Sequence, residues 1–347
     1  MEKTTSWIKR AYRRYVVDGM GGMALGLFAS LLIGTIVKQI AVLPYLAFLV
    51  PLADVASNPY VVGAAIGAAA AMGLKVKPLA VFSAAVTGAI GWSSGGGPIG
   101  ALVAGIVGAE VGNLVAGKTR VDIVLVPLCA LLAGGLVGLY LGPPLDSFMR
   151  WLGRIIGAAT AFAPVPMGMI MALSVGLALT GPISSAALAA MIFQDLSLPG
   201  VALAAGAATV GCCSQMIGFA VASYRENKFG GLLAQGLGTS KLQLPNVFLH
   251  PQILIPATLA GVILGPLATT VFQMTNAGIS AGMGTCGLVG QLGTFTTMTE
   301  AGMPFLSILW RVALLHFVLP AGISLACSEF MRKRGWIKPG DMKLTLQ

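Results

Sequence analysis

The sequence predicts an all-α polytopic membrane protein with about ten transmembrane helices, re-entrant hairpins and an internal repeat. Three observations support this fold class. Of the 347 residues, 56% are hydrophobic and only 9% are charged, whereas soluble proteins are about one quarter charged. The mean hydropathy is +0.89, and apolar runs long enough to cross a bilayer alternate with short basic segments. The 47 glycines fit helices that approach each other closely through small residues.

The chain divides into three predicted parts. Residues 1–18 are basic and aromatic, and we expect them to lie along the cytoplasmic membrane surface as an amphipathic segment. Residues 19–330 are predicted to form the transmembrane domain, and residues 331–347 a basic cytoplasmic tail. The apolar run over 20–42 is longer than the core of a signal peptide and lacks a small-x-small cleavage site. It therefore predicts a retained first span.

Eight apolar runs predict spans directly, since about 20 residues are needed to cross a bilayer. They lie at 19–41, 59–74, 78–94, 98–117, 121–142, 200–223, 252–274 and 305–327. The region 143–199 is interrupted by several prolines, and zero or two crossings there would keep the basic segments on one side. We favour two, near 151–172 and 180–197, which gives ten spans with both termini cytoplasmic.

The charge distribution supports this orientation. The chain has 21 Lys and Arg against 11 Asp and Glu, a net charge of +10. All basic residues except Lys38, Arg150, Arg154 and Arg311 fall in segments that the ten-span topology places in the cytoplasm. This is the positive-inside pattern of membrane proteins, so the positive charge reflects topology and does not indicate nucleic-acid binding.

Three glycine-rich stretches, 92–100, 179–186 and 282–294, are poor candidates for uninterrupted helix. Irregular backbone at membrane depth survives only when it is buried in protein or lines an aqueous cavity, so we expect re-entrant hairpins there. Residues 124–149 also match 253–274 if a four-residue gap is allowed, which suggests an internal repeat. The alternative is that helices rich in Gly, Ala and Leu simply resemble each other.

Glu300 is the main candidate for a solute-binding residue. It carries the only formal charge between Lys241 and Arg311, and an ionisable group in an apolar stretch is a functional-site candidate. Its carboxylate could accept hydrogen bonds from the hydroxyls of a sugar or carry a proton. The alternative is that it caps the final helix, where the macrodipole stabilises an acid. Nearby candidates are Thr297 and Thr299, and Gln291 in the glycine-rich run before them.

His250 is the second candidate. It precedes a proline, which biases the backbone to an extended conformation and places the ring at a helix break. It could donate to a solute hydroxyl or move a proton, or it could be an interfacial histidine without a role. Asn246, which follows Pro245, is a further candidate, or it could simply form a turn.

Motifs of soluble enzymes are absent from the sequence. There is no Walker loop, no HExxH and no GxSxG, and the glycine pairs follow apolar helices instead of a strand. The five cysteines form neither a CxxC pair nor a Cys/His cluster with the spacing of a zinc site. We therefore expect no catalytic residues, no metal and no cofactor.

Four stretches resemble a known membrane-protein family. They are NPYVVGAAIGAAAAMGLKVKP, SSGGGPIGALVAGIVGAEVGN, LPNVFLHPQILIPATLAGVILGP and AGMGTCGLVGQ. With the Gly/Ala-rich ten-span pattern over residues 10–335, they resemble the IIC component (EIIC) of bacterial phosphotransferase-system sugar permeases. The resemblance is greatest to the stand-alone IIC-like branch that includes proposed toxin regulators.

The resemblance implies a fold, a function and a site. Sugar-transporting members carry a substrate-binding glutamate in a GITEP-like motif, with a histidine upstream, which would correspond to Glu300 and His250. Here the proline follows at 304 and not directly after the acid. The implied protein is a permease of the bacterial cytoplasmic membrane, at most the membrane subunit of a phosphotransferase system. It would bind a small polar solute, a sugar, and translocate it by alternating access.

The resemblance also implies partners. Members generally form homodimers, and IIA and IIB domains supply the phosphoryl group. No hydrophilic stretch of this chain reaches the size of a folded domain, roughly 50 residues, so IIA and IIB would be separate proteins. Two alternatives stay open: a phosphorylation-independent transporter of the same fold, proton-coupled or facilitative, and a membrane sensor or regulator.

Overall fold

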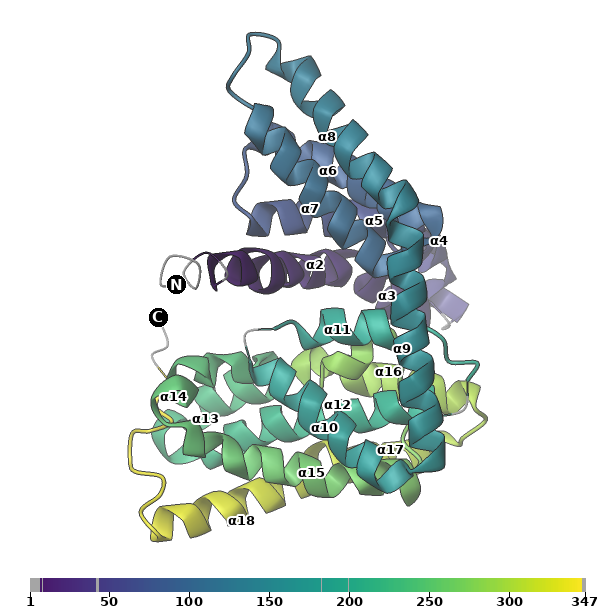
Figure 1. Ribbon diagram of the computed structural model, residues 1–347. Coiled ribbons are helices and arrows are strands. Elements are labelled where there is room, and N and C mark those ends of the chain that lie inside the picture. The colour runs from purple at the N-terminus through teal and green to yellow at the C-terminus, as the bar shows by residue number, and fades with distance from the viewer. Residues whose placement is uncertain (1–6, 8, 42–43, 182, 199, 345–347) are drawn as a thin grey trace. The chain divides into compact units, whose positions relative to one another are not determined.

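The computed structural model describes residues 7, 9–41, 44–181, 183–198 and 200–344 (Figure 1). None of these residues forms a β-strand, which confirms the all-α prediction. The chain divides into two compact units, Met1–Met149 (unit 1) and Arg150–Gln347 (unit 2).

Among the described residues, six helical stretches are long and apolar enough to cross a bilayer. They are Lys9–Lys38, Pro78–Val115, Asp122–Tyr140, Val201–Ala222, Pro251–Thr270 and Phe305–Lys333. A pair of helices bent by 58°, Tyr45–Ala56 and Pro59–Gly73, makes seven if it is counted as one span. The chain is thus a multi-pass membrane protein, and the count of ten spans stays a prediction.

Unit 1 is a bundle of helices joined by short breaks. In order they are η1 (Tyr12–Gly19), α2 (Met20–Leu27), η2 (Phe28–Leu32), α3 (Ile33–Ile40), η3 (Pro44–Leu49), α4 (Val50–Ala56), α5 (Pro59–Gly73), α6 (Pro78–Gly91), η4 (Trp92–Gly96), α7 (Gly97–Val115) and α8 (Asp122–Tyr140).

The long apolar stretch Pro78–Val115 folds back on itself. At one end the backbone N–H of Lys77 donates to Oδ1 of Asn113 at 3.1 Å, and further along Thr87 Oγ1 donates to the Ala104 carbonyl at 3.0 Å. The reversal falls at Gly95 and Gly97, whose φ angles of 84° and 53° suit glycine. The two antiparallel helices, α6 and α7, match the spans predicted at 78–94 and 98–117, and the break lies in the predicted stretch 92–100.

Glycines let the helices of unit 1 touch backbone to backbone. A Cβ on Gly67 of α5 would lie 2.2 Å from the Ala84 carbonyl oxygen on α6. A Cβ on Gly91 would lie 2.3 Å from the Gly100 carbonyl oxygen, and one on Gly134 would lie 2.6 Å from that of Ala104. Any larger residue would therefore push these helices apart.

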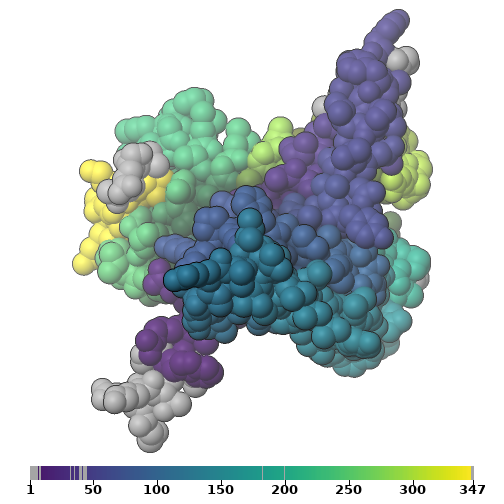
Figure 2. All heavy atoms as spheres, turned by 90° about the horizontal axis from the view of Figure 1, so that it is seen from above, coloured from purple at the N-terminus to yellow at the C-terminus, as the bar shows by residue number. Residues whose placement is uncertain are grey.

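The α3–α4 hairpin projects from the rest of unit 1, as the indigo segment in Figure 2 shows. Its large apolar side chains are exposed: Tyr45, Phe48, Leu52 and Val55. In a membrane-spanning protein such side chains can face lipid without cost, because lipid tails are as apolar as the side chains themselves.

Unit 2 begins within a long helix and ends at the C-terminal segment. Its elements are α9 (Gly142–Phe162), α10 (Pro164–Thr180), α11 (Ser185–Ile192), α12 (Val201–Ala222), α13 (Tyr224–Leu233), η5 (Ala234–Gly238), η6 (Ser240–Gln243), α14 (Leu244–Leu249), η7 (Pro251–Leu254), α15 (Ile255–Thr270), η8 (Gly278–Gly282), η9 (Cys286–Leu288), α16 (Val289–Glu300), α17 (Phe305–Val312), η10 (Ala313–Val318) and α18 (Leu319–Lys333).

The helix boundaries between 143 and 199 differ from the predicted crossings at 151–172 and 180–197. α9 ends at Phe162, because Ala163 precedes a proline and leaves the helical region with φ −134°. α10 ends at Thr180, and α11 has only eight residues. The periodicity of the apolar residues does not reveal these breaks.

α12 is the buried core of unit 2. Helices α10 and α15 pack on it through glycines: a Cβ on Gly211 would lie 2.1 Å from the Ala172 carbonyl oxygen, and one on Gly218 would lie 2.8 Å from the Ala257 Cβ. Cys212 and Cys213 are fully buried in α12 as free thiols, as small hydrophobic residues would be.

Basic residues gather at one end of each unit. In unit 2 the C-terminal ends of α12 and α18 meet, where Arg225 pairs with Glu329 at 2.6 Å. In unit 1 Arg14 pairs with Glu110 at 2.7 Å, near the end where Lys77 bonds Asn113. The side of the membrane that these ends face stays a prediction.

Candidate functional site

Three irregular segments meet beside the middle of α12 in unit 2 (Figure 1). They are the break between α10 and α11, the tip of a first hairpin (residues 224–249), and the tip of a second hairpin (residues 276–300). The two tips touch where Thr285 Oγ1 donates to the Gly236 carbonyl. The second tip touches the start of α11 where Ser185 Oγ donates to the Gly282 carbonyl at 2.6 Å. The predicted breaks at 179–186 and 282–294 therefore lie together.

Buried polar side chains join these segments to the core helices. Thr180, the last residue of α10, donates to Oε1 of Gln215 at 3.1 Å, and its oxygen lies 2.8 Å from that of Ser240. Gln215 in turn donates to Thr258 of α15 at 2.9 Å. Thr180, Gln215 and Ser240 are all almost completely buried. A polar network of this kind at the centre of an apolar unit indicates function.

Lys241 reaches the same place from the first hairpin. Its ammonium donates to the carbonyl oxygens of Gly181 at 2.5 Å, Ile183 at 2.7 Å and Ala178 at 3.4 Å. The topology prediction grouped Lys241 with the cytoplasmic basic segments. The structure places its partly buried side chain against the break between α10 and α11.

Asn276 fixes the base of the second hairpin on α12. Its amide donates to Thr209 at 2.8 Å and to the Gly290 carbonyl at 3.0 Å, and its oxygen accepts from Ser280 at 2.7 Å. The tip then lies directly on α12, because a Cβ on Gly284 would be only 2.7 Å from the Cys212 carbonyl carbon.

Gln291, a predicted site residue, lies in the first turn of α16 beside a buried histidine of η10. Gln291 Nε2 is 3.0 Å from Nδ1 of His316 and donates to the Cys213 sulfur at 3.4 Å. Gln291 is 6% exposed and His316 is 0% exposed. Among the described residues, neither Gln291 Oε1 nor His316 Nε2 has a hydrogen-bond partner.

The other predicted residues of α16 lie toward its far end. Thr297 donates to the Thr275 carbonyl at 2.9 Å. Thr299 and Glu300 are exposed in the last turn of the helix. Glu300 does not cap the final helix, since Pro304 occupies the N-cap of α17 and no side chain bonds there.

His250 and Asn246 lie at the opposite end of unit 2, against the C-terminal segment. His250 Nε2 is 3.6 Å from a carboxylate oxygen of Asp341, and Asn246 donates to the Lys343 carbonyl at 3.0 Å. In Figure 2 the yellow C-terminal residues accordingly adjoin the green part of the chain. The 16 residues of α15, about 24 Å of helix, separate this end from the end near Glu300. The structure therefore does not bring His250 and Asn246 to Glu300.

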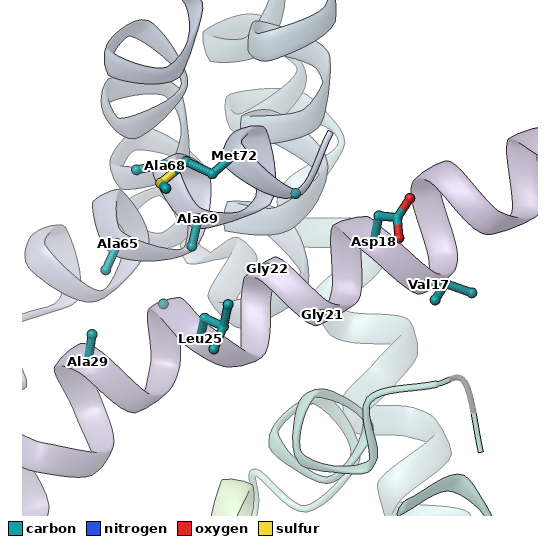
Figure 3. A pocket seen from close by; sticks show the side chains of 12 residues that line it. Val17, Asp18, Gly21, Gly22, Leu25, Ala29, Ala65, Ala68, Ala69 and Met72 are labelled. Carbon is teal, nitrogen blue, oxygen red and sulfur yellow. The ribbon is translucent and has the colours of Figure 1, made fainter. Parts of the chain in front are cut away.

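Unit 1 has a groove of about 740 Å³ between α2 and α5 (Figure 3). Glycine backbone and the side chains of alanine, leucine, valine and methionine line it, and Asp18 is its one charged residue. This lining offers few hydrogen bonds to a polar solute. Among the described residues no group of three His, Cys, Asp or Glu side chains could hold a metal ion.

The family model for the phosphotransferase system EIIC matches residues 17–344 of the chain. The protein belongs to the EIIC family. It is therefore a membrane permease component of the phosphotransferase system. No curated protein matches the sequence.

Several residues of the candidate site in this EIIC protein escaped the sequence analysis. They are Thr180, Gln215, Ser240, Lys241, Thr285 and His316. His316 lies inside an apolar helix, and a histidine there is a signal of the same kind as Glu300. Lys241 gave no such signal, because a lysine between two apolar runs reads as an ordinary loop residue.

Proposed function

We propose that this EIIC protein binds a small polar solute, a sugar, in unit 2 and carries it across the membrane by alternating access. The observation that carries the proposal is the meeting of a broken helix and two hairpin tips, with buried polar side chains, beside the middle of α12. Transporters place substrate sites where helices are interrupted at the midplane, since the freed backbone groups and polar side chains can bind a solute there.

Gln291 and His316 are suited to hold one solute hydroxyl. When the Gln291 amide donates to Nδ1, a neutral His316 ring carries its proton on Nε2. The pair then offers one free N–H donor and one free carbonyl acceptor. A hydroxyl group uses both kinds of partner, and a buried unpaired polar group costs about 1–3 kcal/mol. Binding would remove that cost.

Thr297, Thr299 and Glu300 follow on the same helix, α16, and we propose them as contacts toward its exposed end. His250 and Asn246, at the other end of unit 2, would meet the solute at a different stage of transport. Alternating access would expose the two ends in turn.

The topology completes the proposal. It has ten spans, an internal repeat relating 124–149 to 253–274, and the basic ends of both units in the cytoplasm of a bacterium. Residues 1–18 and 331–347 would lie outside the transmembrane domain on that side. The working form would be a homodimer in the cytoplasmic membrane, with separate IIA and IIB proteins supplying phosphate.

Uptake into proteoliposomes tests the site. We expect Gln291→Leu and His316→Leu to weaken the apparent affinity for the transported sugar about tenfold or more, because each variant removes a buried hydrogen bond worth about 1.4 kcal/mol or more. A panel of radiolabelled sugars would be measured with the wild-type protein first. Gln252→Leu is the matched control, since Gln252 is only partly buried and its side chain forms no hydrogen bond with a described residue.

The outcomes separate the alternatives. Unchanged affinity in both variants would refute the site while leaving the function standing. Uptake that needs no phosphorylated IIA and IIB would favour the phosphorylation-independent transporter, and its loss in Glu300→Gln would point to a proton carried by that acid. Sugar binding without any uptake would favour a sensor.

A further inference from the structure

The last turn of α10 ends in carbonyl groups that the helix itself cannot satisfy. Three oxygens near this end, from Ala178, Gly181 and Ile183, converge on the ammonium of Lys241. An ammonium has three N–H donors and no acceptor, so the donors and acceptors match in number. The negative end of the helix dipole also favours a cation at this position.

The position of Lys241 is fixed from several sides. The backbone N–H of Lys241 donates to Thr239 Oγ1 at 3.2 Å, and the neighbouring Ser240 is buried against Thr180. None of the described carboxylates forms an ion pair with it. Among the described residues, these three carbonyl oxygens are therefore the hydrogen-bond partners of the ammonium.

We infer that the three carbonyl oxygens form a monovalent-cation site and that the chain fills it with the ammonium of Lys241. In ion-coupled transporters, carbonyls at the ends of broken helices coordinate a free ion such as Na⁺. Here the cation is covalently attached to the first hairpin. It joins that hairpin to the break in α10, and the site needs no free Na⁺ to be occupied.

Chemical rescue of Lys241→Ala tests this inference without any knowledge of the solute. Removing the side chain leaves three carbonyls without their donor, and we expect the melting temperature of the purified protein in detergent to fall by about 4–8 °C. Propylammonium chloride, which restores the missing ammonium, should recover about half of this loss or more at saturation. Choline chloride at equal ionic strength should not, because its quaternary nitrogen has no N–H.

Lys338→Ala is the matched control. Lys338 is exposed in the C-terminal segment. The melting temperature of its variant should equal that of the wild type and should not change when propylammonium is added. A wild-type melting temperature for Lys241→Ala, or equal responses to propylammonium and choline, would overturn the inference.

A second measurement covers the case in which Lys241→Ala does not fold. The wild-type protein is treated with a membrane-permeant amine-acylating reagent, and modification of each lysine is followed by mass spectrometry. We expect Lys241 to react at least about tenfold more slowly than Lys338, since all three of its N–H groups are engaged. Equal rates at the two lysines would refute the site.

Discussion

Gly284→Ala should abolish most of the solute uptake and destabilise the protein. Gly284 has φ +56°, where a side chain costs about 1–2 kcal/mol, and its Cβ would lie 2.7 Å from the Cys212 carbonyl carbon. Relieving that clash by moving the backbone costs about 1–3 kcal/mol more. We expect the hairpin tip to be displaced from α12, uptake to fall about tenfold or more, and the melting temperature to drop by about 4–10 °C.

Gly287→Ala separates the clash from the backbone strain. Gly287 lies on the same tip with φ +52°, but the nearest atom to its Cβ would be Val289 Cγ2 at 3.8 Å. This variant should lose only about 1–2 kcal/mol and keep most of its uptake. If the two variants lost uptake equally, seating of the tip on α12 would not be what matters.

Arg332→Met should be the most destabilising single change at the basic end of unit 2. Arg332 Nη2 donates to Glu226 Oε2 at 3.0 Å, Nη1 lies 2.8 Å from Oε1, and each side chain is only 9% exposed. Removing the guanidinium leaves the Glu226 carboxylate buried without its counter-charge. We expect a loss of about 3–5 kcal/mol in the free energy of unfolding, measured by denaturation in detergent.

Two further variants test this explanation. Arg332→Met combined with Glu226→Leu should recover most of the loss, because an apolar pair replaces the ion pair. Arg225→Met breaks the pair with Glu329, whose side chains are 66% and 30% exposed, and should cost no more than about 1 kcal/mol. A double variant as unstable as Arg332→Met alone would show that the carboxylate is not the cause.

The helix breaks were the most predictable part of the fold. The glycine-rich stretches 92–100, 179–186 and 282–294 each contain a break, because glycine and proline act on the backbone locally. The start of α10 was less predictable. Pro164 is one of several prolines that interrupt the region 143–199, and the sequence does not tell which of these prolines begins a helix.

The candidate site was predictable only where a residue differs in polarity from the residues next to it in the sequence. Gln291 was chosen from a glycine-rich run, and the structure places it beside His316. His250 and Glu300 were paired because the family resemblance places a histidine upstream of the substrate-binding glutamate. The two residues lie at opposite ends of α15, and their distance depends on how α15 packs on α12. The residues next to His250 or Glu300 in the sequence do not determine that packing.

The backbone contacts in unit 1 affect how natural variation in this family would be interpreted. Gly67, Gly91 and Gly134 have no room for any side chain, so selection would hold them fixed although they bind nothing. Invariant positions would then be most frequent where the helices of unit 1 cross. Positions that vary between members with different solutes would be the better guide to the residues that determine solute specificity.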